Sequence, residues 1–352
     1  MIGSRLRRAR TACGLSLRNL AAAIDGRVTP QAIGKYERDL DMPSSSVFTA
    51  LAAALSVSVD YLMREDQFEL AGVEFRKQTK SSKEEATIEA RTIDMAERYL
   101  VIEDLLNLGS MDWDRPRGWP FAIDDLRDAE DAAKAVREHW DLGEDPIPQL
   151  AELLEERGVK VLSMDLTGID GLAAQVLRKG HEAAKVIVIK RETWSERKRF
   201  SLAHELGHMM FGRCSIDAEK AANRFAGAFL VPADALKSEI GAHRTAVSIG
   251  ELSALKRRYG VSLQALTYRC KDLAIINSSA YAGLFKIFTE RGWRKPPFQE
   301  PDSIPYENEE PSRFERLCLR AFAEGIISQT KALELLRVGP DVLEQKLNRE
   351  GN

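Results

Sequence analysis

One short motif in the sequence has the residue types and the spacing of a metal site. His204, Glu205 and His208 form the pentapeptide HELGH within the stretch SERKRFSLAHELGHMM. Positions i and i+4 of a helix lie on one face, so two imidazoles at this spacing can bind one tetrahedral zinc ion. With five histidines in 352 residues, roughly 0.005 accidental matches to such a pattern are expected. The motif therefore predicts a helical zinc site with Zn²⁺ as the cofactor.

The glutamate between the two histidines has a position suited to moving protons. Glu205 lies one position round the helix from His204, where it can reach a metal-bound water without binding the metal. Zinc lowers the pKa of its bound water to about 7, and a carboxylate beside that water acts as a general base. Glu205 is thus the predicted catalytic residue. The alternative is a pair of ordinary core histidines, which leaves their burial beside an acid unexplained.

A catalytic zinc ion needs a third protein ligand and an open fourth position. Glu219 starts a second predicted helix, eleven residues after His208, whose apolar face can aim this carboxylate at the metal. Asp217 is the rival ligand, but its place nearer the turn favours a role at the helix start. Asn223, one turn beyond Glu219, either supports a ligand by hydrogen bonding or is an ordinary amide. Cys214 is either a latency switch that fills the fourth position or a small apolar side chain.

The whole chain has the composition of an ordinary globular protein. Its 352 residues, 44% hydrophobic and 30% charged, are enough for two or three domains. The sequence contains no apolar run of about 18 residues, so no membrane span is expected. The basic N-terminus lacks the apolar core of a signal peptide. Four scattered cysteines without a CxxC pair favour a reduced protein. We therefore expect a cytoplasmic protein with no membrane partner.

The first 65 residues are basic, although the whole chain carries a net charge of −3. They hold nine Arg or Lys and six acidic residues, which gives a local charge of +3. A basic module on an acidic chain points to DNA as a partner. The same region predicts five short helices, with Ser16 capping LRNLAAAI and Thr29 capping PQAIGKYER, where Pro30 is the first helical residue. This order is typical of a helix-turn-helix.

The run from Ile2 to Leu62 resembles the Cro/C1-type (XRE) DNA-binding domain in the segments GLSLRNLAAAI, TPQAIGKYER, MPS and LAAALSVSVDYL. The resemblance implies that double-stranded DNA, an operator, is a partner and that the recognition helix begins near Thr29. It implies that Thr29, Gln31 and Lys35 face the major groove, where Gln can bond an adenine and Lys a guanine, or either contacts phosphate alone. Arg18 and Arg38 are further candidate DNA contacts. A dimerisation module without DNA contact is the alternative.

The segment from Gln67 to Pro120 contains a predicted long helix. Ser82 with Glu85 predicts a capping box that opens a helix to about Leu108. Such a helix can be an interdomain strut or a dimer seam, so a homodimer is one expected assembly. Packing against its own chain is the simpler interpretation.

After Ile123 the pattern becomes α+β. Helices are predicted at 123–140 and 147–157, followed by three strands at 160–164, 172–177 and 185–190. The segment from Leu255 to Cys270 is either a second DNA-reading helix pair or a structural one. An acidic, Pro-rich stretch, 296–311, precedes three further predicted helices, at 314–324, 330–336 and 340–347.

The region around HELGH is similar to the ImmA/IrrE family of zinc-dependent metallopeptidases, whose signature is RFxxAHELGH followed by ExxANxFA and a proline. The matching positions are Arg199, Phe200, Ala203 to His208, Glu219, Ala222, Asn223, Phe225, Ala226 and Pro232. The resemblance implies a gluzincin-like site with His204, His208 and Glu219 as metal ligands and Glu205 as the base. Members cleave repressor or regulatory proteins, typically of the helix-turn-helix kind, and similar fusions occur in regulators linked to mobile elements and stress.

These features together predict an α+β, mostly helical protein with a five-helix DNA-binding domain and a zincin-like domain with a small three-stranded sheet. The expected domains are an XRE helix-turn-helix domain at 1–65, a helical linker at 66–120, a metallopeptidase domain at 121–295, and a loop with a helical cap at 296–352.

The predicted function is that of a DNA-binding transcriptional regulator with a zinc-dependent endopeptidase. Its protein substrate is expected to be a helix-turn-helix repressor, another regulator or its own chain, cleaved in response to stress. The alternative is a non-proteolytic repressor or antitoxin with a structural or sensory metal site.

Overall fold

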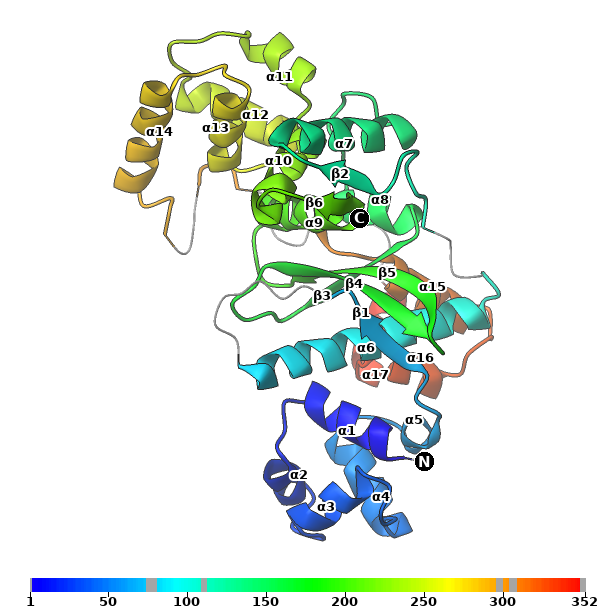
Figure 1. Cartoon of the computed structure of the whole chain (residues 1–352). Coiled ribbons are helices and arrows are strands. Elements are labelled where there is room, and N and C mark those ends of the chain that lie inside the picture. The colour runs from blue at the N-terminus through cyan, green and yellow to red at the C-terminus, as the bar shows by residue number, and fades with distance from the viewer. Residues whose placement is uncertain (1, 74–80, 109–112, 296–299, 304–308, 349–352) are drawn as a thin grey trace. The chain divides into compact units, whose positions relative to one another are not determined.

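The computed structural model describes residues 2–73, 81–108, 113–295, 300–303 and 309–348. The chain divides into two compact units (Figure 1). Unit 1 comprises Met1–Asp112, Ala174–Val186 and Ser312–Asn352, and unit 2 comprises Trp113–Ala173 and Ile187–Pro311. Helices predominate and the sheets are small, which confirms the predicted α+β, mostly helical class. Within the described ranges, no helix is both long enough and apolar enough to cross a membrane.

Unit 1 begins with five short helices whose ends follow the sequence signals. Their bounds are α1 Gly3–Ala12, α2 Leu17–Ala23, α3 Pro30–Tyr36, α4 Ser45–Ala54 and α5 Val59–Met63. The Ser16 hydroxyl accepts a hydrogen bond from the Asn19 amide, and the Thr29 hydroxyl accepts one from the Ala32 amide. Side-chain caps of this kind satisfy amides that have no partner within the helix. Both predicted caps are therefore confirmed.

The five helices enclose a core of their own. Each of the five helices contributes one fully buried leucine or isoleucine to it: Leu6, Leu20, Ile33, Leu51 and Leu62. Between α2 and α3, Asp25 and Gly26 both have positive φ, at 58° and 64°. Gly adopts this left-handed backbone freely and Asp tolerates it, so two consecutive residues reverse the chain between the helices.

A long helix, α6 (Ser82–Leu105), follows in unit 1. Its capping box pairs Ser81 with Glu84, one residue earlier than the predicted pair Ser82 and Glu85. The prediction was wrong by one position because two serines and two glutamates are adjacent here, so sequence spacing alone fits either register. The helix ends at Leu105, short of the predicted Leu108.

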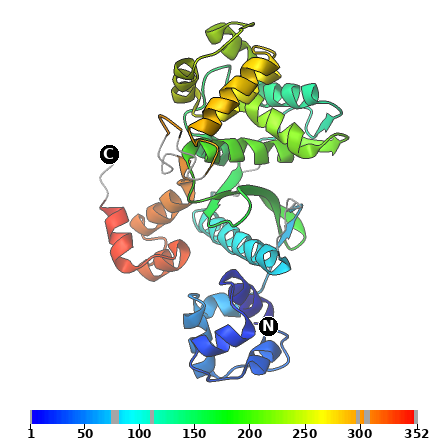
Figure 2. The same ribbon diagram turned by 90° about the vertical axis from the view of Figure 1, so that its left-hand side faces the viewer.

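Three C-terminal helices of unit 1 follow, the first two of which contact α6 (Figure 2). They are α15 Arg313–Ala323, α16 Gln329–Leu336 and α17 Pro340–Leu347. Arg313 of α15 forms an ion pair with the buried Glu103 of α6, and Arg337 lies 2.7 Å from the buried Asp94. The long helix thus packs against its own chain, as the simpler interpretation held, and buried acids on α6 determine where the C-terminal helices attach.

The larger sheet has four strands in the order β1-β4-β5-β3. They are β1 Phe68–Ala71, β4 Gly171–Arg178, β5 His181–Lys190 and β3 Val159–Met164. The expected three-stranded sheet thus gains β1, which pairs antiparallel with β4, Phe68 opposite Arg178 and Ala71 opposite Gln175. A second, parallel pair joins β2 Phe121–Ile123 to β6 Phe211–Cys214. Strands of three or four residues are too short to produce a recognisable alternation in the sequence.

Unit 2 contains the helices that carry and surround the HELGH motif. They are α7 Leu126–His139, α8 Leu150–Glu156, α9 Ser195–Met210, α10 Ala218–Leu230, α11 Ala233–Ile240, α12 Ile249–Tyr259, α13 Leu263–Asp272 and α14 Ser278–Glu290. The motif lies on α9, which packs against α10. Gly207 makes this close packing possible, because a methyl group at this position would lie 3.1 Å from the ring of Phe225 on α10.

Carboxylates of the acidic stretch after residue 299 bind buried cations of unit 2. Glu309 accepts hydrogen bonds from Arg199 of α9, at 2.8 Å, and from the Ala151 amide of α8, at 2.7 Å. Glu300 pairs with Lys256 at 3.1 Å, and Glu310 pairs with Lys198. An unpaired buried cation is strongly destabilising. These acids are therefore part of the structure that supports α9.

We expect Glu309→Ala to lower the free energy of unfolding by about 3–5 kcal/mol, because it leaves buried Arg199 without its carboxylate. Chemical unfolding followed by near-ultraviolet circular dichroism measures this loss. Glu290→Gln is the control, since Glu290 pairs only loosely with Lys286, at 3.9 Å, on the surface. That change should stay within about 0.5 kcal/mol. Equal effects of the two substitutions would contradict a supporting role for Glu309.

Candidate metal centre and nucleic-acid interface

Helix α9 places both histidines of the HELGH motif on one side, facing α10. His204 is 2% exposed, and the His208 side chain is 18% exposed. The helix is buried on nearly all sides, since Leu202, Ala203 and Leu206 also lie in the unit 2 core. A buried helix is a rigid support, so the two imidazoles are held at a fixed separation.

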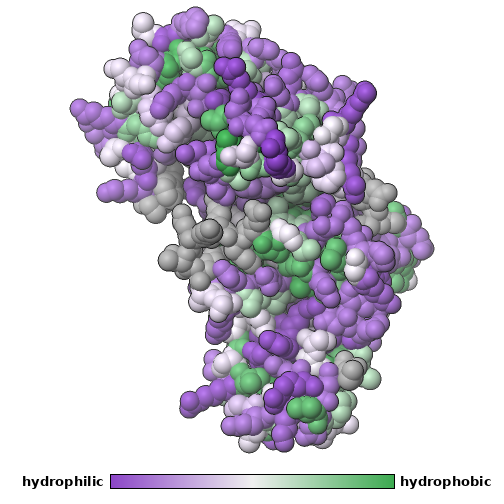
Figure 3. Space-filling view, in the orientation of Figure 1, coloured by the Kyte–Doolittle hydropathy of each residue, from purple (hydrophilic) through white to green (hydrophobic). Residues whose placement is uncertain are grey.

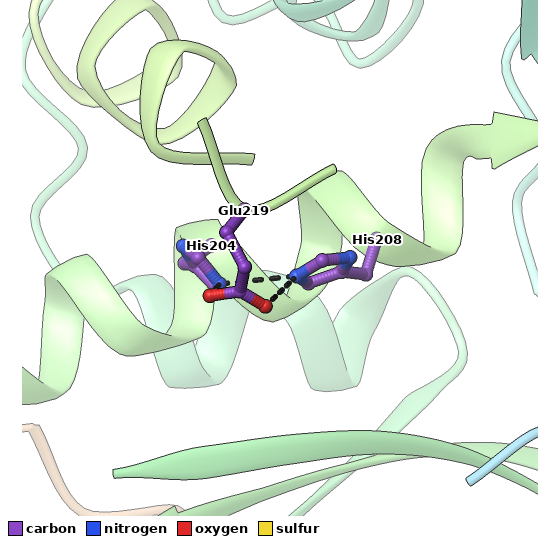
Figure 4. Close-up of side chains that lie close together, drawn as sticks. All are labelled: His204, His208 and Glu219. Carbon is purple, nitrogen blue, oxygen red and sulfur yellow. Dashed lines mark hydrogen bonds and ion pairs between the residues drawn. The ribbon is translucent and has the colours of Figure 1, made fainter. Parts of the chain in front are cut away.

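Three ligand atoms converge at this point (Figure 4). The two Nε2 atoms of His204 and His208 are 3.1 Å apart. The carboxylate of Glu219 on α10 lies 3.6 Å from His204 Nε2 and 3.4 Å from His208 Nε2. Bonds of about 2.0–2.1 Å around a tetrahedral zinc ion separate neighbouring ligand atoms by about 3.3–3.4 Å. The donor set and its spacing therefore fit one tetrahedral metal ion.

A hydrogen bond that His204 donates to Asn223 orients the first imidazole. His204 Nδ1 and the Asn223 side-chain oxygen are 2.9 Å apart. Because that oxygen can only accept, Nδ1 carries the proton and Nε2 presents its lone pair to the ligand cluster. Asn223 lies one helical turn beyond Glu219 on α10, so one helix supplies both a carboxylate to the cluster and the partner that fixes the ring.

The structure separates the two acids that competed for the third ligand position. Asp217 is the N-cap of α10, and its carboxylate accepts hydrogen bonds from the amides of Glu219 and Lys220. Glu219 is the acid whose oxygens reach the two histidines. Its side chain is 44% exposed, so the cluster is open to solvent on the side of this carboxylate.

Glu205 and Cys214 lie outside the cluster of three ligand atoms found among the described residues. Glu205 is 5% exposed and follows His204 on α9, as the motif requires. Cys214 ends strand β6, and its thiol donates to the carbonyl of Ile216 at 3.4 Å. The switch proposed for this thiol stays a prediction.

The five candidate DNA contacts are exposed on unit 1. Thr29, Gln31, Lys35 and Arg38 lie on α3 or at its ends, and Arg18 lies in the first turn of α2. Ile33 and Tyr36 face the core from the same helix. Helix α3 therefore presents polar side chains outward at its N-terminal end, the part of a recognition helix that contacts base edges.

Several basic residues counted toward the charge of this region are engaged within unit 1. Arg5 is 1% exposed and forms an ion pair of 2.5 Å with Glu97 of α6. Arg8 pairs with Asp66, and Arg10 pairs with Glu37, each at 2.5 Å. These arginines attach α1 to its neighbours, so the net charge of the segment overstates the charge available to DNA.

Tyr61 lies beside the same buried ion pairs. Its pKa is raised to about 12, first by burial and then by the nearby carboxylates of Asp94 and Glu97, while Arg5 and Arg8 lower it. The phenol therefore stays neutral at physiological pH.

Family models match two parts of the chain. A helix-turn-helix model matches residues 6–62, and a peptidase model described as the IrrE N-terminal-like domain matches residues 154–271. The chain fuses a helix-turn-helix domain to an IrrE N-terminal-like domain. Both resemblances expected from the sequence are thereby confirmed. The comparison with curated proteins gave no match.

The matched IrrE N-terminal-like domain contains every residue of the candidate metal centre. It spans β3 to α13, and therefore includes α9 with the HELGH motif and α10 with Glu219 and Asn223. The matched helix-turn-helix domain spans α2 to α5 and most of α1. The helix-turn-helix domain indicates a DNA-binding regulator. The IrrE N-terminal-like domain is of a peptidase family, which implies a protein substrate.

Helices α12 and α13 of the IrrE N-terminal-like domain are a structural pair. Lys256 and Arg269, two cations that could have contacted DNA, are buried, and they pair with Glu196 and Glu130. Arg257 pairs with Asp302 at 2.7 Å. These engaged charges favour the structural interpretation of the segment from Leu255 to Cys270.

Sequence reasoning recognised Arg199 only as part of a motif. Its guanidinium donates to the carbonyls of Ile147 and Tyr259 and to Glu309, so it joins α9 to three separate segments. Gly260 leaves room for it, since a methyl group there would lie 2.7 Å from Arg199 Nε. No local pattern reveals these partners, because they lie 52, 60 and 110 residues away along the chain.

Proposed function

We propose that this chain is a DNA-binding transcriptional regulator whose IrrE N-terminal-like domain is a zinc-dependent endopeptidase. The observation that carries the proposal is the cluster of His204, His208 and Glu219, whose ligand atoms are spaced for one tetrahedral ion. Two imidazoles and one carboxylate, with an open side, are the protein ligands typical of catalytic zinc.

Bound zinc would supply a polarised substrate carbonyl and an acidified water. Glu205 would take the proton of the attacking water and pass it to the leaving amine. Its low exposure, 5%, and its place directly after His204 on α9 support this role. Asn223 would hold His204 in the tautomer that binds metal. The exposed side at Glu219 would admit the substrate.

The substrate we propose is a helix-turn-helix repressor, another regulatory protein or a segment of this chain, cleaved in response to stress. The fusion supports this proposal, because a DNA-reading domain brings the peptidase to the promoters where such regulators bind. Exposed Thr29, Gln31 and Lys35 would read base edges, while Arg18 and Arg38 would contact the DNA backbone.

We expect about one zinc ion per purified chain, measured by inductively coupled plasma mass spectrometry. His204→Ala combined with His208→Ala should remove the ion, and Glu219→Gln should weaken its binding. Asn223→Ala should lower the affinity about 10–100-fold, because His204 loses its orienting partner. His243→Ala, an exposed histidine outside the cluster, is the matched control. Full zinc occupancy in the double histidine variant would refute the site.

DNA binding is tested on duplexes selected from a random library with the intact protein. Gln31→Ala should relax the preference at one base position by about 1–3 kcal/mol. Arg18→Ala should weaken binding to all sequences and reduce the slope of affinity against salt by about one. Arg320→Ala, an exposed arginine on α15, is the control that should change neither. If Gln31 and Arg18 variants bind as the parent protein does, α3 is not the reader.

The peptidase proposal is tested with Glu205→Gln, which removes the base but leaves all three ligands. Zinc content and folding should persist, while hydrolysis falls by orders of magnitude. The measurement is a survey of new protein N-termini after the parent protein or the variant is added to a lysate of the source cells. Glu192→Gln, an exposed acid of the same unit, should cut as the parent does.

The alternative, a repressor with a structural or sensory metal, predicts a different result. In that case the parent protein and Glu205→Gln produce the same N-termini and control a reporter promoter equally under every inducing stress. This outcome would overturn the peptidase proposal while leaving the metal site in place.

A further inference from the structure

The first residue of strand β4 lies directly against the proposed general base. A methyl group at Gly171 would lie 3.1 Å from Glu205 Cγ, 3.2 Å from Glu205 Oε1 and 3.0 Å from the carbonyl oxygen of Val188 on β5. Gly171 and Glu205 are both buried and both belong to unit 2. Figure 4 shows strands of the sheet passing beneath the helix that carries His204 and His208.

Space, and not backbone conformation, explains the glycine at this position. Gly171 is not among the residues with positive φ, so its backbone is one that any amino acid can adopt. The distances from a methyl group to all three neighbouring atoms are at or below 3.2 Å, tighter than nine in ten real contacts of this kind. Any side chain would therefore have to displace a neighbour.

Of those neighbours, the glutamate side chain is the one that can move. Val188 lies inside β5, and its carbonyl belongs to the backbone of a central strand. The Glu205 carboxylate rotates about single bonds, so it would yield first. Ala173, two residues on and on the same face of β4, also packs against the unit 2 core. On this face of β4, the missing side chain of Gly171 leaves room for Glu205 of α9.

We propose that Gly171 is a positioning residue for Glu205: its missing side chain lets the β4 backbone serve as the wall that holds this carboxylate beside the ligand cluster. The catalytic consequence rests on the proposed function, in which Glu205 is the base. The contact itself does not. A methyl group at position 171 would push the carboxylate out of place, and none of the three atoms nearest to it belongs to His204, His208 or Glu219.

The first test measures the contact in metal-free protein, without any substrate. Gly171→Ala should lower the thermal midpoint by several degrees, because an overpacked core is destabilised. In a Glu205→Ala background, Gly171→Ala should lower the thermal midpoint by clearly less, since the space left by the carboxylate accepts the methyl group. Gly283→Ala is the matched control: this glycine of α14 has no atom within 4 Å of an added methyl and should lose nothing.

An equal loss of midpoint in both backgrounds would overturn the proposal, because the strain would then come from Val188 alone. If Gly171→Ala does not fold by itself, recovery of folding in the Gly171→Ala/Glu205→Ala double variant supports the proposal. Failure of the double variant to fold overturns it.

The second test uses a protein that the parent enzyme cleaves. Gly171→Ala should keep its zinc and its KM within about twofold, while kcat falls at least tenfold, as expected when only a group acting in the transition state is displaced. An unchanged kcat in folded, zinc-loaded Gly171→Ala would overturn the positioning role. If the parent protein cleaves nothing, the proposed function fails. The comparison of thermal midpoints in the two backgrounds still decides whether Gly171 holds Glu205.

Discussion

The packing of α10 against α9 is the constraint on which the candidate metal centre depends. One helix can bring two imidazoles to the same side, but it cannot close a cluster around a metal alone. Glu219 reaches both histidines because Asp217 starts α10 at the right residue and because Gly207 lets Phe225 approach α9. The same helix supplies Asn223, which fixes the ring of His204. Loss of this single helix contact would take both Glu219 and Asn223 away from the two histidines.

Around that contact, unit 2 uses buried charge to hold α9 in place. Lys198, Arg199 and Lys256 are all buried cations with acidic partners, and Glu300, Glu309 and Glu310 come from a segment far along the chain. Buried ion pairs add little net stability, but each is costly to break and therefore specifies one arrangement. The candidate metal centre needs such precision, because ligand atoms displaced by an ångström no longer share one ion.

The features that the sequence predicted correctly depend on interactions between residues close together in the chain. Ser16, Thr29 and Pro30 mark helix ends by chemistry confined to one turn, and HELGH needs only the helical repeat. Strand β1 was not predicted because four residues show too little alternation. The capping pair Ser81 and Glu84 was missed by one residue because the neighbouring pair fits the same spacing. Ion-pair partners far apart in the sequence could not be predicted, for a different reason. Nothing near Arg5 indicates Glu97, and nothing near Arg199 indicates Glu309, since such pairs exist only after folding.

Unit 1 is assembled from three separate stretches of chain, and this has a consequence for the order in which the protein is built. The helix-turn-helix domain is continuous, with a core of its own, so it can fold as soon as it leaves the ribosome. Glu103 and Asp94 of α6 have no such independence, because their partners Arg313 and Arg337 are synthesised more than two hundred residues later. During translation the helix-turn-helix domain can therefore be complete well before α15 and α16 dock on α6.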